Sequence, residues 1–448
     1  MLLNGARLLI FLSPLLLNLL SPSCSLALFG MANYYLGIDF GTSGARAIAV
    51  DEDKNIVATA QSRFSRVSPD ELTQTWKNTL FALIVDIPPE IRKCIKAIAI
   101  NGTSSTVLLC DEAGQTVTAP LLYNDDRGKV VLEKIKAIAP KNHVVTSATS
   151  SLAKLLWWQQ QAYFTKARYL LHQADWLSWL LHGKLGVSDY HNALKLGYDV
   201  EHFCYPDWLQ NNTYCFLYPQ VLTPGAAVGK ITQKNCDRFN LSSDCTIKAG
   251  TTDSIAAFLA SGATQPGEAV TSLGSTLVLK LLSTTRITAA NYGIYSHRLG
   301  NLWLAGGASN TGGAVLRHFF SNKELHDLSG QIDPNIKSPL KYYPLLKPGD
   351  RFPINDPNLA PKLSPRPTNS VEFLQGLLEG ISRIEATGYQ KLQNLGADKL
   401  LRVYTAGGGA KNQIWQEIRQ RYLQVSVSKA ENAEAAYGTA LLATQKLA

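Results

Sequence analysis

Two turns rich in glycine and hydroxyl side chains carry the strongest chemical signal in this sequence. The first is Gly41-Thr42-Ser43, which follows the apolar run 36–40, and the second is Gly274-Ser275-Thr276, which follows the run 270–273. Glycine permits close approach of the backbone, so turns of this kind present N–H groups and hydroxyls to phosphate oxygens. Because the two turns stand about half a chain apart, they predict two lobes that close on one nucleotide.

Asp39 lies near the end of the first apolar run, two residues before Gly41. A carboxylate at the end of a buried strand can hold Mg²⁺ or a water molecule of its shell. A turn-capping aspartate is the alternative, but an unpaired charge among apolar neighbours is costly, and this favours the metal. For each single hydroxyl of the two turns, an ordinary hairpin turn remains the alternative.

The composition is that of a folded protein with more than one core. The chain has 448 residues, of which 46% are hydrophobic and 17% are charged, and this length predicts two domains. The net charge of +9 is dispersed, and no Lys/Arg block is long enough to suggest an arm that binds nucleic acid. We expect no nucleic-acid partner, and an anionic substrate or cofactor is compatible with the mild positive charge.

The cysteines and histidines show no pattern typical of a metal or disulfide site. The seven cysteines are odd in number and have no CxxC spacing, and the eight histidines have no HxxxH spacing. This argues against a disulfide framework and a zinc site, and it favours a reducing compartment. We therefore assign no structural metal and expect a cytoplasmic protein.

The first 30 residues differ from the rest because they form a hydrophobic segment. Arg7 precedes the almost wholly apolar run 8–20. We interpret residues 1–30 as an upstream start that precedes the true one at Met31; a genuine hydrophobic leader and a transit peptide are the alternatives. We leave this segment out of the predicted fold and expect no membrane contact from the folded core.

From residue 34 onward the pattern alternates between strands and helices. We expect strands over 36–40, 45–50, 95–100 and 401–406, and helices over 71–84, 151–167, 169–182, 371–392 and 412–422. The proline-rich segment 337–367 is predicted to be a surface excursion. These elements predict a duplicated α/β architecture with a cleft between two lobes, which we assign to residues 31–247 and 248–448.

Five motifs resemble those of the FGGY carbohydrate kinases, and they occur in that family's order. They are the phosphate motif 37–43, the S-x-x-K-φ-x-W signature in 151–160, the stretch 174–193, and the two adenosine-side segments 405–412 and 434–440. One such motif would be weak evidence, whereas five in order are strong. The resemblance covers nearly the whole chain from Tyr34 onward, and it is greatest for the xylulose-kinase-like D-ribulose kinases of cyanobacteria and plants.

The resemblance implies an actin-like, ribonuclease-H-like duplicated fold and phosphoryl transfer from MgATP to a sugar. In the family pattern Asp253 takes the position of the catalytic base and contacts the sugar. An N-cap aspartate is the ordinary alternative at such a strand-to-helix junction. Asp39 would orient Mg²⁺ and lie against the substrate.

The remaining binding residues fall on the sugar side and the nucleotide side. On the sugar side Ser104 is a candidate because it follows the strand 95–100, and the resemblance implies Asp125 and Arg127, although a surface turn explains these two equally well. On the nucleotide side they are Gly41, Thr42, Ser43, Gly274, Ser275, Thr276, Gly407, Gly408 and Asn412. For Gly407 and Gly408 the alternative is a strand-to-helix loop whose glycines serve packing alone.

We therefore predict an ATP- and Mg²⁺-dependent kinase that converts D-ribulose to D-ribulose 5-phosphate, as a monomer or a homodimer. D-xylulose is the alternative substrate, because the two sugars differ only in the configuration of one hydroxyl. A non-catalytic, actin-like ATP-binding regulatory protein is the other alternative. The signature residues 154–160 and the absence of a peptide-binding extension argue against it.

Overall fold

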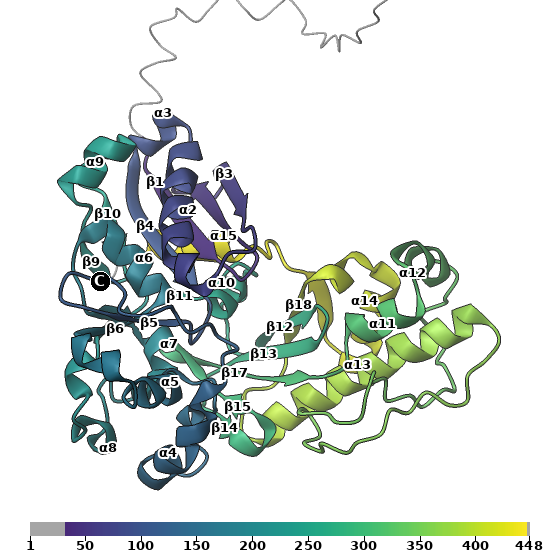
Figure 1. Ribbon diagram of the computed structural model, residues 1–448. Helices are drawn as coiled ribbons and strands as arrows, with labels where there is room; N and C mark the ends of the chain where they lie inside the picture. Colours follow the sequence, from purple (N-terminus) through teal and green to yellow (C-terminus); the bar gives the residue numbers. More distant parts are fainter. Residues whose placement is uncertain (1–31, 446–448) are drawn as a thin grey trace, which may run out of the picture.

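The computed structural model describes residues 32–445. The segment 1–30, which we interpret as an upstream start or a leader, lies outside the described residues. Within residues 32–445 the chain forms two lobes, each built around its own β-sheet (Figure 1). In this range no helix combines the length and the apolar character that a membrane crossing requires.

The first lobe is an α/β unit that also carries the smaller sheets of the molecule. Its elements are, in chain order, β1 (Tyr34–Phe40), β2 (Gly44–Val50), β3 (Ile56–Arg63), α2 (Leu72–Asp86), α3 (Pro89–Arg92), β4 (Ile95–Gly102), β5 (Val107–Cys110), α4 (Leu132–Ile138), α5 (Ser151–Trp158), β6 (Tyr169–His172), α6 (Gln173–His182), β7 (Val187–Asp189), α7 (Tyr190–Ala193), α8 (Asp207–Gln210), β8 (Gln220–Leu222), β9 (Ala227–Lys230), α9 (Gln233–Phe239), β10 (Thr246–Lys248), β11 (Thr251–Thr252) and α10 (Asp253–Leu259).

Seven strands form the main sheet of this lobe, in the order β3-β2-β1-β4-β10-β9, with β11 beside β4. β1 and β2 form an antiparallel hairpin, whereas β1, β10 and β11 run parallel to β4. The carboxyl ends of β1, β4 and β11 therefore meet at one edge of the sheet.

The side chains of β1 point alternately to the two faces of this sheet, and each face packs against different helices. Leu36, Ile38 and Phe40 belong to a core that includes residues of α2, α6 and α9. Gly37 lies against the opposite face, which is covered by the last helix of the chain, α15 (Ala435–Thr444). A side chain at Gly37 would overlap the backbone of that helix, so this position requires glycine.

The second lobe repeats the plan with a six-stranded sheet. Its elements are β12 (Glu268–Leu273), β13 (Leu277–Ser283), β14 (Thr288–Ala289), β15 (Ile294–Tyr295), β16 (His297–Leu299), β17 (Leu302–Ser309), α11 (Gly313–Phe319), α12 (Asn322–Ser329), α13 (Ser370–Asn394), β18 (Arg402–Ala406), α14 (Gln413–Leu423) and β19 (Ser426–Lys429). The strand order is β16-β17-β13-β12-β18-β19. Residues of α13 and α14 share a core with one face of this sheet, and residues of α10 pack on the other.

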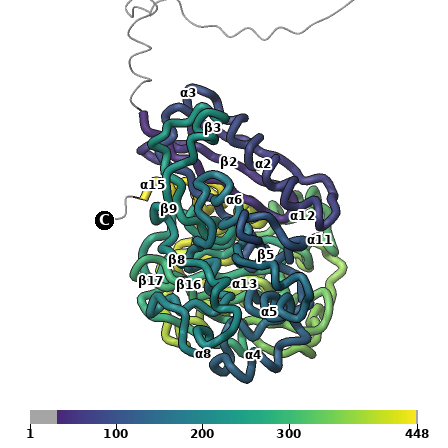
Figure 2. The backbone as a smooth tube through the Cα atoms, turned by 60° about the vertical axis from the view of Figure 1, so that its left-hand side comes forward, coloured from purple at the N-terminus to yellow at the C-terminus, as the bar shows by residue number. Residues whose placement is uncertain are grey.

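The two lobes are joined by α10 and α15, which pack against each other. α15 comes from the end of the chain but lies against β1, β2 and β4 of the first sheet, as Figures 1 and 2 show in yellow. Its Thr439 Oγ1 accepts a hydrogen bond of 2.6 Å from Asn101 Nδ2 of β4. A side chain at Gly438 would overlap the carbonyl oxygen of Ala256 in α10, so the close crossing of these helices depends on glycine.

A third core supports the loops that follow β4. It is formed by apolar residues of β5, β6, α4 and α5, and β5 pairs with β6 in a separate two-stranded sheet. This small layer lies between the end of β4 and the helix α5. It thereby determines where the candidate sugar-side residues stand.

Three of the expected elements differ in the structure. The helix expected over 169–182 begins only at Gln173, because residues 169–172 form β6 and pair with β5. The helix expected over 151–167 ends at Trp158 and is followed by a separate helical turn. The proline-rich segment 337–367 is only partly a surface excursion, because Tyr342 and Phe352 are buried in the second core.

Candidate active site

Both candidate carboxylates lie at the ends of strands on either side of β4. In the register of the sheet, Asn101 of β4 is paired with Asp39 on one side and with Thr251 on the other. Asp253 follows Thr251 by two residues and is the first residue of α10. The topology therefore brings Asp39 and Asp253, which are far apart in sequence, to the same edge of the first sheet.

Asp39 has one carboxylate oxygen without a partner. Its Oδ1 is buried and forms no hydrogen bond with the described residues. Burial, and next the negative charge of Asp253, raise the pKa of Asp39 to about 6. The nearby Asn101 amide and Arg46 act in the opposite direction. A half-buried carboxylate with an unused oxygen is suited to a hard cation or to a water molecule bound to one.

Asp253 stands at the start of α10 but not at its cap position. The cap residue is Thr252, and Asp253 Oδ1 accepts a hydrogen bond of 2.6 Å from the backbone N–H of Ser254. Burial raises the pKa of Asp253, whereas this hydrogen bond and the ammonium groups of Lys280 and Lys195 lower it. The N-cap alternative from the sequence therefore does not describe its position.

The sequence did not predict the two lysines near Asp253. Lys280 belongs to β13 of the second lobe, and its Nζ donates to the carbonyl oxygen of Ser254. Burial lowers the pKa of Lys280 to about 8, while the charge of Asp253 raises it. Lys195 follows α7, and its Nζ lies 5.9 Å from the centre of the Tyr295 ring. A lone charge inside the apolar strand 277–283 is the signal that points to Lys280, and Lys195 has no comparable signal.

His191 connects the segment that carries Asp253 to the second lobe. Its Nδ1 lies 2.7 Å from Thr251 Oγ1, and its Nε2 lies 2.6 Å from the carbonyl oxygen of Arg298. Burial lowers the pKa of His191 to about 4, so the ring is neutral at physiological pH. The acceptor at Arg298 then assigns the proton to Nε2, and Nδ1 accepts from the threonine hydroxyl.

The first predicted phosphate turn connects β1 to β2 and is open to solvent. The N–H of Gly41 donates to the carbonyl oxygen of Gly44 at 3.0 Å, which closes the turn. The side chains of Thr42 and Ser43 are exposed. Their hydroxyls are therefore free to meet a ligand directly beside Asp39.

The second predicted phosphate turn connects β12 to β13 and is fixed by the start of α11. The carbonyl oxygen of Gly274 accepts from the N–H of Gly313 at 2.9 Å, and Ser275 Oγ accepts from Arg317 Nη2 at 2.9 Å. Gly312 has a φ of 140°, and a Cβ there would press on the backbone of Thr276. The close crossing of α11 over this turn thus needs glycine, and hydrogen bonds from Gly313 and Arg317 attach the turn to α11.

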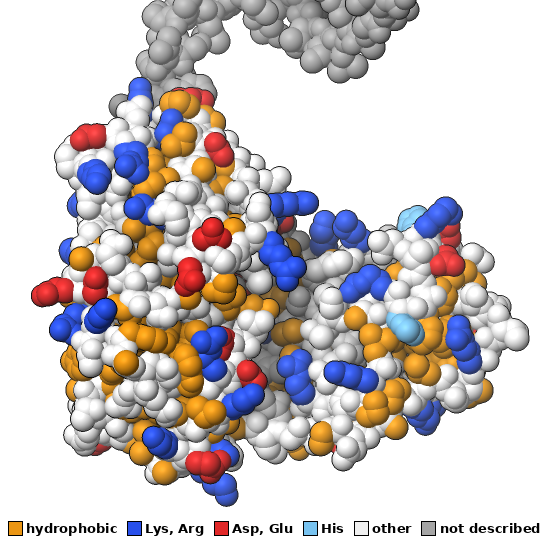
Figure 3. Space-filling model, in the orientation of Figure 1, with side chains coloured by type: hydrophobic (Ala, Val, Ile, Leu, Met, Phe, Trp, Pro, Cys, Tyr) orange, Lys and Arg blue, Asp and Glu red, His pale blue; other side chains and the backbone are white. Residues whose placement is uncertain are grey.

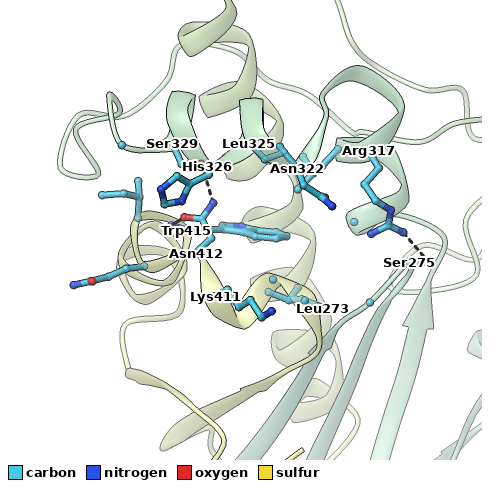
Figure 4. A pocket seen from close by; sticks show the side chains of 18 residues that line it. Leu273, Ser275, Arg317, Asn322, Leu325, His326, Ser329, Lys411, Asn412 and Trp415 are labelled. Atoms are coloured by element: carbon cyan, nitrogen blue, oxygen red, sulfur yellow. Dashed lines mark hydrogen bonds between the residues drawn. The ribbon is translucent and has the colours of Figure 1, made fainter. Parts of the chain in front are cut away.

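A cavity of about 730 Å³ lies beside the second turn, among α11, α12 and the start of α14 (Figure 4). This volume is in the range of small-molecule and cofactor sites. Four of the predicted nucleotide-side residues line it: Gly274, Ser275, Gly408 and Asn412. The lining also includes residues that sequence reasoning missed: Leu273, Arg317, Asn322, Leu325, His326, Ser329, Lys411 and Trp415. The apolar members offer a surface for a flat ring, and the polar members surround its edge.

Asn412 and Gly407 have local structural roles at this cavity. Asn412 Oδ1 accepts from the N–H of Trp415 at 2.9 Å, and its Nδ2 donates to Ser329 Oγ at 2.8 Å. Its amide is thus already paired, and a direct bond from Asn412 to a ligand stays a prediction. Gly407 is not among the residues that line the cavity; it has a φ of 82°, and a Cβ there would press on the carbonyl oxygen of Leu273.

The three predicted sugar-side residues come from two neighbouring loops. Ser104 is half-buried in the turn that follows β4. Asp125 forms an ion pair with Arg127 at 2.9 Å, and the Arg127 guanidinium lies 4.7 Å from the centre of the Trp157 ring. Figure 3 shows a hollow between the two lobes with Lys and Arg side chains along its rim. An anionic ligand is the natural partner of such a rim.

Two family models match nearly the whole of the described chain. The N-terminal domain of the FGGY family of carbohydrate kinases matches residues 34–260, and the C-terminal domain of that family matches residues 269–446. The division into 31–247 and 248–448 stays a prediction. The xylulose kinase of Staphylococcus epidermidis is 23% identical over 444 residues, which cover 92% of this chain and 88% of that protein.

Solved structures confirm the expected fold. The xylulose kinase from Brucella ovis has a TM-score of 0.78 at 22% identity, and the match covers 92% of this chain and 90% of that one. The Plasmodium falciparum glycerol kinase with ADP has a TM-score of 0.77 at 16% identity and covers 92% and 89% of the two chains. With two domain models that match almost end to end, the chain belongs to the FGGY family of carbohydrate kinases.

Proposed function

We propose that this carbohydrate kinase transfers the γ-phosphoryl group of ATP to the terminal hydroxyl of a ketopentose, and that the ketopentose is D-ribulose. The observation that carries the proposal is the meeting of Asp39 and Asp253 at one edge of the first sheet. A phosphate turn stands directly beside Asp39, and a second turn in the other lobe borders a cavity of about 730 Å³. Two carboxylates with two anion-binding turns are the parts that phosphoryl transfer requires.

Asp253 is the proposed general base. Its carboxylate accepts the proton of the sugar hydroxyl while that oxygen forms a bond to the γ-phosphorus. The bond between the γ-phosphorus and the bridging oxygen breaks in the same step and releases ADP. The ammonium groups of Lys280 and Lys195 support the charged form of Asp253 against the effect of burial, and this is the form that a base needs.

Asp39 fits a divalent cation. Its buried Oδ1 has no partner among the described residues, and repulsion from Asp253 disfavours its charge. A cation bound nearby would give Oδ1 a partner and would reduce the repulsion between the two carboxylates. Magnesium in kinases is held through one or two carboxylates together with phosphate oxygens, and when bound it neutralises charge on the transferred group.

The nucleotide is proposed to bind across the second lobe. Gly274 and Ser275 would meet its phosphates, and the cavity beside them would take adenosine, with Gly408 allowing close approach of the base. Arg317 fixes the hydroxyl of Ser275 and would add positive charge next to the phosphates. Thr42 and Ser43 of the first turn would complete the γ-phosphate site from the other lobe. Closure of the lobes would then exclude water and suppress hydrolysis of ATP.

The choice of sugar is proposed from the likeness to D-ribulose kinases noted in the sequence. D-xylulose is the second candidate, because relatives such as the Staphylococcus epidermidis protein are named xylulose kinase. Ser104, Asp125 and Arg127 are the residues proposed to meet the sugar hydroxyls. Once the lobes close over the sugar, a misplaced hydroxyl would leave one of these polar groups unpaired, at a cost of about 1–3 kcal/mol.

A coupled assay of ADP release tests the proposal. We expect kcat/KM for D-ribulose to exceed that for D-xylulose, glycerol and hexoses. A preference for D-xylulose would overturn the choice of sugar, and a lack of turnover with every sugar would overturn the ketopentose proposal as a whole. Ser104→Ala should raise the KM for the sugar much more than the KM for ATP, and equal effects on both would assign Ser104 a structural role.

A further inference from the structure

The S-x-x-K-φ-x-W signature lies on α5 and contains a fully buried lysine. Lys154 has a side chain with 0% exposure, although lysine is almost never fully buried unless it is paired. No carboxylate lies within ion-pair distance of its ammonium group in the described part of the chain. Its role must therefore come from the backbone groups that it contacts.

The ammonium group of Lys154 joins two loops. Its Nζ donates to the carbonyl oxygen of Ser105 at 2.7 Å and to that of Leu122 at 2.6 Å. Ser105 directly follows Ser104, and Leu122 comes three residues before Asp125. One side chain thus fixes both of the loops that carry the candidate sugar-side residues.

The first of these loops needs such support, because Ser105 has a φ of 66°. This is the left-handed region, which a residue other than glycine enters at a cost. Ser105 Oγ is buried and has no hydrogen-bond partner among the described residues, so its own side chain does not stabilise the turn. The bond from Lys154 acts on the carbonyl of this strained residue.

The second loop is held by another residue of the same signature. Trp157 lies under the guanidinium of Arg127 at 4.7 Å, and Arg127 in turn donates from Nε and from its backbone N–H to Asp125 Oδ1. Lys154 and Trp157 stand three residues apart on α5, and this spacing places them on neighbouring positions of the helix surface. The signature therefore acts on both loops from one helix.

We propose that Lys154, assisted by Trp157, is a positioning residue for sugar recognition: it holds the turn 103–106 and the loop 122–127 in register with each other and does not itself contact the sugar. The inference rests on the proposed function, because it takes these loops as the sugar wall. It gives the signature a physical reason: the buried Lys154 Nζ donates to one carbonyl of each loop and so links two loops that have no direct hydrogen bond to each other in the described chain.

Lys154→Met tests the proposal, because methionine is nearly as long as lysine, is unbranched and has no hydrogen-bond donor. We expect the KM for the sugar to rise at least about tenfold and the KM for ATP to change less than about twofold. Lys184→Met is the matched control. Lys184 also donates from Nζ to a backbone carbonyl, that of Val228 at 2.7 Å, but it is exposed and lies outside the two loops. This control should leave both KM values unchanged.

A double variant separates positioning from general damage. Glycine adopts the left-handed conformation without strain, so Ser105→Gly combined with Lys154→Met should recover part of the lost sugar affinity. Trp157→Leu supplies an independent test if Lys154→Met does not fold, since Trp157 is only partly buried. We expect Trp157→Leu to raise the KM for the sugar about two- to threefold, without an effect on the KM for ATP.

The proposal is overturned if a folded Lys154→Met protein keeps its KM for the sugar, or if both KM values rise together. It is overturned equally if Trp157→Leu leaves the KM for the sugar unchanged. These outcomes differ from a failure of the proposed function, in which the unaltered protein itself phosphorylates no sugar. The test uses whichever sugar the unaltered protein phosphorylates best, so it does not depend on D-ribulose.

Discussion

Replacing Asp39 by asparagine should stabilise the ligand-free protein while it impairs the kinase. The variant keeps the size of the side chain and removes a charge that burial and Asp253 disfavour. The pKa of Asp39 is about 6, against an ordinary value of 3.8. A shift of about two units corresponds to about 3 kcal/mol, at about 1.4 kcal/mol for each unit.

The pH dependence of this stability gain follows from the proton on Asp39, which the folded chain binds more tightly than the unfolded chain does. Because the pKa is raised in the folded chain, ionised Asp39 costs stability above about pH 6, and this cost disappears as the pH falls toward 3.8. The variant also loses the attraction of Arg46 and is partly screened by solvent, so we expect a net gain of about 1–2 kcal/mol. For a chain of 448 residues this corresponds to a rise in Tm of about 1–2 °C near pH 7.5.

Thermal unfolding without nucleotide, followed by circular dichroism, measures this gain. The difference in stability between Asp39→Asn and the unaltered protein should shrink by more than half between about pH 7.5 and about pH 4.5. Asp53→Asn is the control, because Asp53 is exposed, and its Tm should not change. A lower Tm for Asp39→Asn at neutral pH, or a difference that does not depend on pH, would refute the account of Asp39. In the kinase assay the same variant should respond more weakly to Mg²⁺.

Three further predictions concern the hinge, the nucleotide side and the pH dependence. Gly438→Ala should destabilise the protein by about 2 kcal/mol or more and lower the Tm by about 2 °C or more, because its Cβ overlaps the carbonyl of Ala256. The control Gly408→Ala, whose Cβ meets no atom within 4 Å, should leave the Tm unchanged, and equal Tm values for the two variants would refute the close helix crossing. Arg317→Met should raise the KM for ATP about tenfold and leave the KM for the sugar unchanged in steady-state assays, whereas equal rises would contradict a nucleotide-side role. Lys280→Met should move the acidic limb of the kcat profile to higher pH, because the Lys280 ammonium lowers the pKa of the Asp253 carboxylate, and an acidic limb that does not move would contradict the assignment.

The elements that the sequence predicts well are those whose burial is visible in a single run of residues. β1 and β4 lie in the middle of the first sheet with both faces covered, so 36–40 and 95–100 are apolar runs except for Asp39 and Lys96. Asp39 stands near the end of the first of these runs, and its place at the sheet edge follows directly. Asp253 could be placed in the same way, because Thr251 and Thr252 form a short strand just before it.

The elements that the sequence predicts poorly are those whose partner is distant in the chain. Residues 169–172 are apolar and precede a helix, and only their pairing with β5, some 60 residues earlier, makes them a strand. Phe352 is buried although it stands in a proline-rich segment, because Gly307 and Gly388 leave space for its ring between β17 and α13. Neither the pairing of β6 with β5 nor the packing of Phe352 can be inferred from the residues that are adjacent in sequence.

The same limit explains which site residues were missed. Lys280 comes from β13 and Lys195 from the turn after α7, and only the tertiary structure brings both ammonium groups close enough to lower the pKa of Asp253. Arg317 likewise reaches Ser275 only because α11 crosses over the turn. A motif identifies residues that are adjacent in sequence to a glycine turn. The charged side chains around the turn come from distant parts of the sequence, and only the tertiary structure brings them together.

The most direct test of the central claim is the turnover of Asp253→Asn on the best sugar, measured together with its affinity for ATP. Loss of the base should lower kcat by about two to four orders of magnitude, while the Kd for ATP stays within about twofold of that of the unaltered protein. A variant that retains near-normal turnover would contradict the assignment of Asp253 as the base, and with it the account of phosphoryl transfer at this edge of the sheet.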